Sequence, residues 1–271
     1  MVNEKLISEI RKKKGFISDM DGVIYHGNQL LPGVKDFVKW LKKENKRFLF
    51  LTNSSERTPR ELQEKLKRMG IDVERDVFYT SALATAHFLS SQKHKGTAYI
   101  IGEAGLINAM YNAGYTMNNI DPDYVVVGDS RSYSFEKIER AVNLVLKGAK
   151  LIGTNPDLTG PIEGGITPST KALIAPIELS TGKQAYFVGK PNPLMMRIAL
   201  RKLGCRTEDT IIIGDRMDTD IIAGIESEID TCLVLSGIAS RDTLKEFPYY
   251  PHFVLDNVGD IVAGIEKKRK S

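Results

Sequence analysis

Short apolar runs typical of buried β-strands alternate with segments of helical periodicity along this 271-residue chain. In the helical segments, apolar residues recur every three or four positions, as on one buried face of a helix. This order of elements predicts parallel sheets covered by helices. The strand-like runs span residues 15–18, 47–51, 99–101, 124–127, 150–153, 186–188, 211–213 and 231–235.

A polar cluster follows four of these strand-like runs. In chain order, the clusters are Asp19 with Asp21, Thr52-Asn53-Ser54, Gly189-Lys190, and Gly214-Asp215. In open parallel sheets, ligands bind at the edge formed by the carboxyl ends of the strands. One such cluster would be an ordinary turn, but four with complementary chemistry predict a single site at that edge.

Asp19 and Asp21 are two carboxylates separated by one residue. Like charges this close raise each other's proton affinity unless a cation or hydrogen bonds relieve them. The pair therefore predicts one ionised carboxylate beside one that carries a proton. Attack on a phosphate ester by Asp19, followed by protonation of the leaving group by Asp21, needs these two states.

The remaining clusters supply groups that would neutralise and hold a phosphate. Asp19 and Asp215 together make a hard oxygen site suited to Mg²⁺, and Lys190 adds a second positive charge. The hydroxyl of Thr52 and the backbone N–H of Asn53, in a loop that includes Ser54, would hold the phosphoryl oxygens.

Asp218 and Asp220 follow Asp215 closely. Because Thr219-Asp220 is predicted to begin a helix, Asp220 is expected to orient water or Lys190 rather than to bind the metal directly. Each of these residues also has an ordinary structural interpretation. Both aspartates could cap a helix, Thr52 could cap a turn, and Lys190 could be a surface lysine.

Thr52 and Lys190 lie far apart in the sequence, whereas Asp19 and Thr52 are close. The long stretch between Thr52 and Lys190 contains several predicted strands and helices of its own. It therefore predicts an inserted second domain. We expect a discontinuous core made of residues 1–78 and 186–271, and an inserted domain at residues 79–185.

Composition narrows the class of protein. No apolar stretch approaches the roughly 18–20 residues of a membrane span, and the N-terminus lacks the apolar segment of a secretory signal. The two cysteines, Cys205 and Cys232, do not make a disulfide framework. A cytoplasmic protein with free thiols and no membrane partner is expected.

The net charge of +4 comes from two basic runs, Arg11–Lys14 and Lys267–Lys270, without which the chain would be acidic. No aromatic residues interleave these charges, so we expect solvated, frayed ends and no nucleic-acid partner.

Four segments resemble the motifs of phosphatases of the haloacid dehalogenase (HAD) superfamily. They are Asp19-Met20-Asp21-Gly22, Thr52-Asn53, Lys190, and Gly214-Asp215 with Thr219-Asp220. Their order and spacing match the branch with an α/β (type IIA) cap inserted between the second and third motifs. Further stretches are similar to the NagD-like ribonucleotide monophosphatases of this branch: 77–82, 131–133, 153–157, 188–191 and 235–237.

The resemblance implies an α/β fold with a Rossmann-like core, a parallel sheet with helices on both faces, and a smaller inserted α/β cap. It implies Mg²⁺ dependence and an aspartyl-phosphate intermediate. The metal ligands carried over are Asp19, the backbone carbonyl of Asp21, and Asp215. Asp21 is the implied general acid/base, while Thr52, Asn53 and Lys190 are the implied phosphate contacts.

The implied substrate is a small phosphorylated metabolite, with nucleoside monophosphates favoured and sugar phosphates open. The cap would select the leaving group. Within it, the turn Thr154-Asn155-Pro156-Asp157 offers Asn155 as a candidate contact to the non-phosphate part of the substrate. Both a monomer and a homo-oligomer are compatible with the sequence.

Two other functions share these residue types. A receiver-like signalling module is also phosphorylated on an aspartate, but such modules are about half this length and lack a long insertion before the lysine. A phosphoryl transferase of the same fold is the other alternative. A carboxylate at Asp21 favours water as the acceptor, because it can activate a water molecule.

Local signals give four further predictions. Thr58-Pro59-Arg60-Glu61 is a helix start, and Gly70 ends that helix. Pro176 should kink or break the helix predicted over 169–179.

His26 is not expected to be catalytic, because Asp21 already supplies the acid and base. Arg216 could point to the site or to solvent.

Overall fold

The computed structural model describes residues 4–162 and 164–263. By contacts between residues, the chain divides into two compact units. The first unit contains the chain up to Leu51, the segment Gln63–Phe78 and the chain from Met196 onward. The second unit contains Thr52–Leu62 and Tyr79–Met195.

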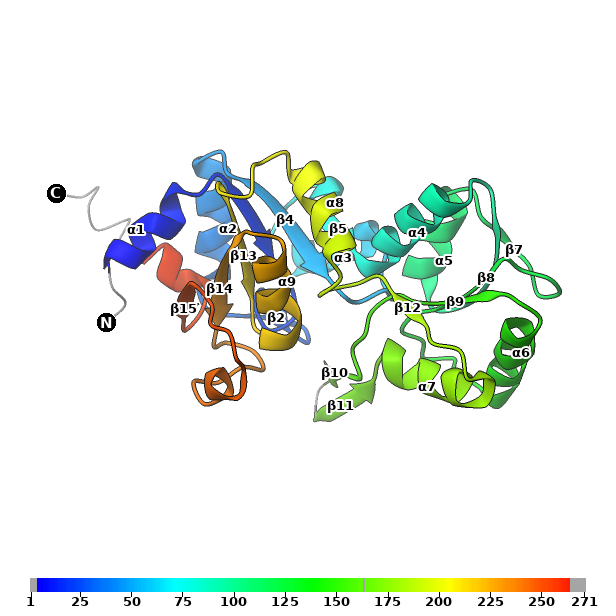
Figure 1. The fold of residues 1–271 in the computed structure, drawn as a ribbon. Helices are drawn as coiled ribbons and strands as arrows, with labels where there is room; N and C mark the ends of the chain where they lie inside the picture. The colour runs from blue at the N-terminus through cyan, green and yellow to red at the C-terminus, as the bar shows by residue number, and fades with distance from the viewer. Residues whose placement is uncertain (1–3, 163, 264–271) are drawn as a thin grey trace. The chain divides into compact units, whose positions relative to one another are not determined.

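The first unit is built on a six-stranded sheet with the order β15-β14-β13-β1-β4-β5 (Figure 1). Strands β1, β4, β13, β14 and β15 pair in parallel, which confirms the predicted parallel sheet. A separate antiparallel hairpin, β2–β3, follows β1. The strands are β1 Gly15–Ser18, β2 Tyr25–His26, β3 Gln29–Leu30, β4 Arg47–Thr52, β5 Phe78–Thr80, β13 Thr210–Gly214, β14 Asp230–Val234 and β15 Phe253–Leu255.

Helices cover both faces of this sheet. The rings of Phe16 in β1 and Trp40 in α2 pack in a T-shaped arrangement, with ring centroids 5.4 Å apart. Gly224 of α9 lies very close to β13. A Cβ added at Gly224 would lie 2.6 Å from the side chain of Ile212. Ile212 pairs with Ile17, the residue after Phe16, and successive strand residues point to opposite faces. Helices α2 and α9 therefore lie on opposite faces.

The α-helices that begin or lie largely in the first unit are α1 Glu4–Lys12, α2 Val34–Lys43, α3 Pro59–Arg68, α8 Pro193–Leu203 and α9 Ile222–Glu226. Short helical turns complete it: η1 Arg75–Val77, η2 Met217–Ile221, η3 Thr243–Glu246 and η4 Val258–Ile261.

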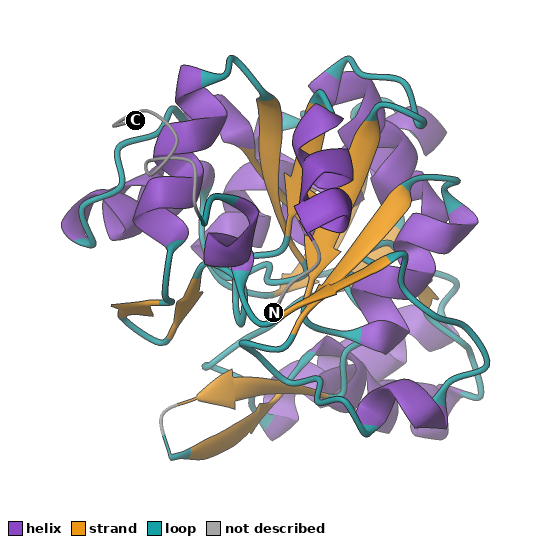
Figure 2. Ribbon diagram, turned by 90° about the vertical axis from the view of Figure 1, so that its left-hand side faces the viewer, coloured by secondary structure: helices purple, strands orange, loops and turns teal. Residues whose placement is uncertain are grey.

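The second unit has its own parallel sheet with the order β12-β9-β8-β6-β7. Helices α4 and α5 lie on one side of this sheet, and α6 and α7 lie on the other (Figure 1). A separate antiparallel hairpin, β10–β11, follows β9 (Figure 2). The elements are α4 Ser81–Gln92, β6 Thr97–Ile101, α5 Ala104–Asn112, β7 Thr116–Met117, β8 Tyr124–Val127, α6 Phe135–Leu146, β9 Lys150–Gly153, β10 Thr159–Ile162, β11 Gly165–Pro168, α7 Thr170–Thr181 and β12 Tyr186–Phe187.

The start and the end of α3 are as predicted. The Thr58 Oγ1 accepts a hydrogen bond from the backbone N–H of Glu61 at 3.2 Å, and the Glu61 carboxylate accepts one from the backbone N–H of Thr58 at 2.8 Å. These two bonds form a reciprocal capping box. Gly70 follows the helix with a φ of 87°, the left-handed conformation that glycine adopts without strain.

Of the kink or break predicted at Pro176, the break is wrong, because α7 runs through Pro176 from Thr170 to Thr181. Pro176 cannot donate the backbone hydrogen bond of a normal helical residue. Leu173, Ile174 and Ile177 on the same helix are buried in the core between α6, α7 and the sheet. Burial of these side chains outweighs the loss of one hydrogen bond.

The expectation of a frayed basic N-terminus is also wrong. Helix α1 buries Ile7 and Ile10, and the Arg11 Nε donates to the backbone oxygen of Ile261 at 2.6 Å. Lys13 and Lys14 form ion pairs with Asp230 and Asp209, with N–O distances of 2.6 and 2.9 Å. Tertiary contacts therefore order this segment. The second basic run, Lys267–Lys270, lies outside the described residues.

Both cysteines are free, and complete burial raises the pKa of the Cys232 thiol. Among residues 4–162 and 164–263, no helix combines the length and the apolar character needed to cross a membrane.

A carboxylate on the second unit gives this fold a measurable acid sensitivity. The Lys93 ammonium and the Thr97 backbone N–H bond the Asp123 carboxylate and lower its pKa. A carboxylate whose pKa is lower in the folded state stabilises that state when the pH is above its unfolded-state pKa of about 3.9. This stabilisation is lost as the pH falls through the folded-state pKa. We expect Asp123→Asn to flatten the pH dependence of Tm below about pH 4. Thermal melts between pH 3 and pH 7 test this prediction, and parallel Tm curves for the variant and the wild type would contradict it.

Candidate active site

Three carboxylates of the first unit form an acidic cluster: Asp19, Asp215 and Asp220. Each offers an oxygen within 4.8 Å of the oxygens of the other two. Asp19 directly follows β1, and Asp215 directly follows β13, its neighbour in the sheet. Asp220 comes from the turn η2, which follows β13. The cluster therefore lies at the carboxyl edge of the sheet, where the sequence placed Asp19 and Asp215.

Backbone hydrogen bonds hold the acidic cluster in place. The N–H of Asp19 donates to the backbone oxygen of Ile213 at 2.8 Å, which continues the β1–β13 pairing by one residue. The carboxylate of Asp215 accepts from the N–H of Ile238 at 2.8 Å. The carboxylate of Asp220 accepts from the N–H of Arg216 at 3.2 Å.

Two glycines leave room for the carboxylate of Asp215. A Cβ on Gly22 would lie 2.2 Å from the Asp215 Oδ2, and a Cβ on Gly237 would lie 2.0 Å from the same atom. Both distances are far shorter than any non-bonded contact between heavy atoms allows. Any larger residue at either position would displace Asp215.

The acidic cluster fits a single Mg²⁺ ion. Ligand oxygens about 2.0–2.1 Å from the ion lie about 4 Å apart when they are on opposite sides of it. The oxygens of the cluster all lie within 4.8 Å of one another, and carboxylates are the ligands that Mg²⁺ prefers. A divalent cation would also relieve the repulsion between three neighbouring carboxylates.

Asp220 lies closer to the metal-ligand candidates than the sequence indicated. Its predicted role was indirect, yet its carboxylate belongs to the acidic cluster. Thr219 and Asp220 do not begin an α-helix, because they lie within the π-helical turn η2, and α9 begins at Ile222. The wider turn buries Asp220 completely and directs it toward β13.

Asp21 lies in a tight turn after Asp19. The N–H groups of Ile24 and Tyr25 donate to the backbone oxygen of Met20, and the N–H of Gly22 donates to that of Tyr25. This turn leads into the hairpin β2–β3. The side chain of Asp21 is half-buried and is not among the three carboxylates of the acidic cluster.

Arg216 and Asp218, next to the acidic cluster, pair with each other. The guanidinium of Arg216 makes two hydrogen bonds to the Asp218 carboxylate, at 3.0 and 2.8 Å. Burial of Asp218 acts against its charged form, but the bonds and charge of Arg216 outweigh it, so the pKa of Asp218 is below its usual value. His26 is exposed on the hairpin β2–β3.

The predicted phosphate contacts belong to the second unit. Thr52 is the last residue of β4, and Asn53 and Ser54 follow it. The side chain of Asn53 holds the backbone of Lys190 at both polar atoms. Its Oδ1 accepts from the Lys190 N–H at 2.8 Å, and its Nδ2 donates to the Lys190 carbonyl at 3.0 Å. The loop after β4 and the residue Lys190 are thereby joined, although they lie far apart in the sequence.

Asn155 also belongs to the second unit and is completely buried. Its Nδ2 donates to the backbone oxygen of Asn53 at 2.8 Å and to the Thr170 Oγ1 at 3.1 Å. Its Oδ1 accepts from the backbone N–H of Asp157 at 3.1 Å. The contact of Asn155 with a substrate stays a prediction, and the bonds in this structure give its side chain a role in supporting the loop after β4.

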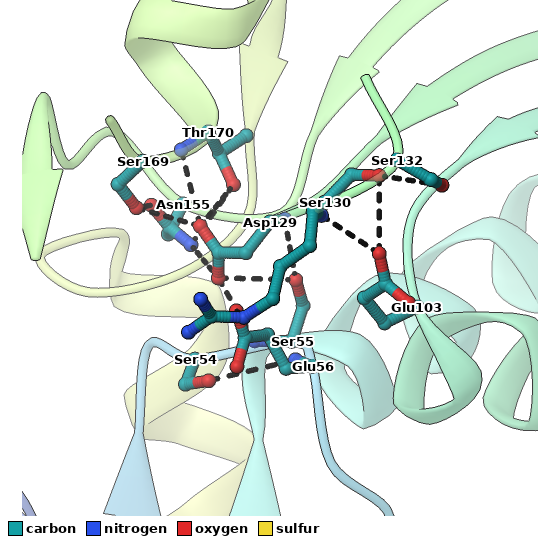
Figure 3. A network of polar contacts seen from close by, with 11 residues as sticks. Ser54, Ser55, Glu56, Glu103, Asp129, Ser130, Ser132, Asn155, Ser169 and Thr170 are labelled. Atoms are coloured by element: carbon teal, nitrogen blue, oxygen red, sulfur yellow. Dashed lines mark hydrogen bonds and ion pairs between the residues drawn. The ribbon is translucent and has the colours of Figure 1, made fainter. Parts of the chain in front are cut away.

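A polar network around Asp129 was not found from the sequence (Figure 3). The Asp129 carboxylate accepts hydrogen bonds from Ser55, Asn155, Ser169 and Thr170. A signal for it was present, because Gly128-Asp129 follows an apolar strand just as Gly214-Asp215 does. Applying the rule about strand ends to every strand would have included Asp129.

Family models identify the class of protein. A model described as haloacid dehalogenase-like hydrolase matches residues 16–116, and a model described as HAD-hydrolase-like matches residues 187–261.

The alignments with individual relatives extend over almost the whole chain. The chain is 45% identical to the dihydroxyacetone phosphatase of Corynebacterium glutamicum over 91% of this chain and 90% of that protein. It is 40% identical to the ribonucleotide monophosphatase NagD of Escherichia coli over 92% of this chain and 98% of NagD. The structure of a 4-nitrophenylphosphatase from Thermotoga maritima superposes with a TM-score of 0.90 at 32% identity, over 96% of this chain and 99% of that one.

The chain therefore belongs to the haloacid dehalogenase-like hydrolases. Within that family it is a phosphatase, and the structure of NagD matches its fold with a TM-score of 0.86. A receiver-like signalling module, the first alternative raised by the sequence, finds no support among these relatives.

Proposed function

We propose that this phosphatase hydrolyses small phosphate monoesters through a covalent aspartyl phosphate on Asp19. The observation that carries the proposal is the acidic cluster at the ends of β1 and β13. Asp19 would attack the phosphorus atom and displace the alkoxide of the leaving group. Asp21 would protonate that alkoxide and would then remove a proton from the water that hydrolyses the aspartyl phosphate.

The remaining groups would hold the phosphate and balance its charge. Thr52, Asn53 and Ser54 are the proposed contacts to the phosphoryl oxygens, and Lys190 is proposed to supply a positive charge. The bond pattern between Asn53 and the backbone of Lys190 supports this grouping.

We propose that Asp19, Asp215 and the backbone carbonyl of Asp21 hold Mg²⁺, with the carboxylate of Asp220 beside them in the cluster. When bound, the ion neutralises negative charge on the phosphate and on the nucleophile. The geometry of Asp215, fixed by Ile238 and the two glycines, supports its role as a ligand.

The metal proposal predicts a clear difference between two neighbouring aspartates. Asp215→Asn should weaken Mg²⁺ binding by roughly tenfold or more, because a carboxylate is replaced by a neutral amide. Asp218→Asn should leave it unchanged, because Asp218 pairs with Arg216 outside the cluster. Isothermal titration of each purified variant with MgCl₂ measures both values. Equal affinities for the two variants would contradict the proposed ligand set.

We propose that residues 79–185 form the cap that selects the leaving group. Nucleoside monophosphates are the substrates that the sequence favours. The relative named dihydroxyacetone phosphatase adds three-carbon phosphates to the candidates, and sugar phosphates stay among them.

Phosphate release from a panel of nucleoside monophosphates, triose phosphates and hexose phosphates, each with and without Mg²⁺, tests the function. A protein that releases no phosphate from any of them, nor from p-nitrophenyl phosphate, would overturn it. Product analysis in the presence of sugar acceptors distinguishes hydrolysis from transfer.

A further inference from the structure

The carboxylate of Asp129 binds donors from three separate segments of the second unit (Figure 3). Its Oδ1 accepts from the Ser169 Oγ at 2.6 Å, and from the backbone N–H and the Oγ1 of Thr170, each at 3.1 Å. Its Oδ2 accepts from Ser55, in the loop after β4, and from the Asn155 Nδ2 at 3.4 Å, in the loop after β9. One side chain therefore joins both loops to the beginning of α7.

The connection between Asp129 and Ser55 runs in both directions. The Ser55 backbone N–H and Oγ donate to the Asp129 Oδ2 at 3.1 and 3.2 Å. In return, the backbone N–H of Asp129 donates to the Ser55 Oγ at 2.9 Å. Gly128 permits this approach, since a Cβ there would lie 2.5 Å from the Ser55 Oγ. These three bonds fix the backbone of Ser55 relative to the end of β8.

Ser55 directly follows the proposed phosphate contacts Thr52, Asn53 and Ser54. The same Asn155 Nδ2 that approaches Asp129 also donates to the backbone oxygen of Asn53 at 2.8 Å. Asp129 therefore supports the phosphate-binding loop at two points, once at Ser55 and once through Asn155. The loop after β4 groups by its contacts with this unit, rather than with the sheet that β4 belongs to.

The charge of Asp129 matters for this arrangement. A carboxylate can accept four or more hydrogen bonds, and bonds to an ionised acceptor are about twice as strong as neutral ones. An amide in the same place presents an NH₂ group toward donors that need an acceptor. Replacement of Asp129 by asparagine would therefore keep the size of the side chain but remove the hydrogen bonds accepted by one of its two carboxylate oxygens.

We propose that Asp129 is a positioning residue for the phosphate-binding loop 52–55, acting through Ser55 and Asn155 without touching the substrate. This inference rests on the proposed phosphatase mechanism. It assigns a segment of the inserted sheet, the end of β8, the task of setting the backbone N–H groups that receive the phosphate.

The test compares Asp129→Asn with the matched control Asp123→Asn. Asp123 also accepts several hydrogen bonds, but from Thr97 and Lys93 at the opposite end of β8. The measured quantities are kcat/KM for p-nitrophenyl phosphate, the inhibition constant of inorganic phosphate, and Tm. For Asp129→Asn we expect kcat/KM to fall and the inhibition constant to rise, each by roughly tenfold or more, because small displacements of positioning groups are costly. For Asp123→Asn both constants should match the wild type.

If Asp129→Asn retains wild-type kinetic constants, or changes only Tm as the control does, the inference is wrong. If Asp129→Asn does not fold, Ser55→Ala decides, since it removes the shared hydroxyl and keeps the other bonds of Asp129. Ser55→Ala should then weaken phosphate inhibition, and an unchanged inhibition constant would overturn the inference. Absence of activity in the wild type would instead refute the proposed function itself.

Discussion

Asp19→Asn should abolish hydrolysis of phosphate monoesters while leaving the fold intact. An amide is a poor nucleophile, and the substitution also removes one oxygen from the acidic cluster. Loss of the group that forms the covalent intermediate should lower kcat by roughly 10⁶-fold. Initial rates with p-nitrophenyl phosphate and saturating Mg²⁺ give the value, and circular dichroism with Tm confirms that the variant is folded.

The suitable control for Asp19→Asn is Asp218→Asn. Asp218 lies three residues after Asp215, and it pairs with Arg216 rather than joining the acidic cluster. The control removes one negative charge close to the site and should retain most of the wild-type turnover. Turnover of Asp19→Asn equal to that of the wild type would show that Asp19 is not the nucleophile.

The parallel sheets were predictable because their pattern is local. Each buried strand is a mainly apolar run, such as Thr210–Gly214. In each crossover helix, apolar residues recur every three or four positions. The cap of α3 was equally readable, since Thr58 and Glu61 meet within one turn. The two predictions that failed, at the N-terminus and at Pro176, concern segments whose structure depends on tertiary packing. Arg11 of helix α1 contacts Ile261, and Lys13, just after that helix, pairs with Asp230. Helix α7 continues through Pro176 because its apolar face is buried.

The aspartates of the candidate site were predictable from strand ends, whereas their partners were not. Asp19 and Asp215 follow neighbouring strands, so the topology alone brings them together. The side chain of Asn53 binds the backbone of Lys190, 137 positions away, and Ser55 binds Asp129, 74 positions away. Such bonds depend on the path of two loops at atomic precision. No periodicity in the sequence encodes that path, so the sequence indicated the chemistry of Asn53 without its structural role.

Asp21→Asn should slow both the formation and the breakdown of the phosphoenzyme, by roughly 10²–10⁴-fold for each step that needs proton transfer. Asp21 lies in the turn after β1, its side chain is half-buried, and it is not one of the three carboxylates of the acidic cluster. An amide cannot donate a proton to the alkoxide or accept one from water.

The leaving group gives this second prediction a sharp signature. p-Nitrophenolate leaves without protonation, whereas an alkoxide needs it, so Asp21→Asn should lose more activity toward alkyl phosphates than toward p-nitrophenyl phosphate. Rapid-quench measurements of the phosphoenzyme separate formation from breakdown for both substrates. A loss confined to substrate affinity, with kcat unchanged for both, would show that Asp21 binds the substrate and transfers no proton. An equal loss of kcat for both substrates, with normal breakdown, would place Asp21 in metal or phosphate binding instead.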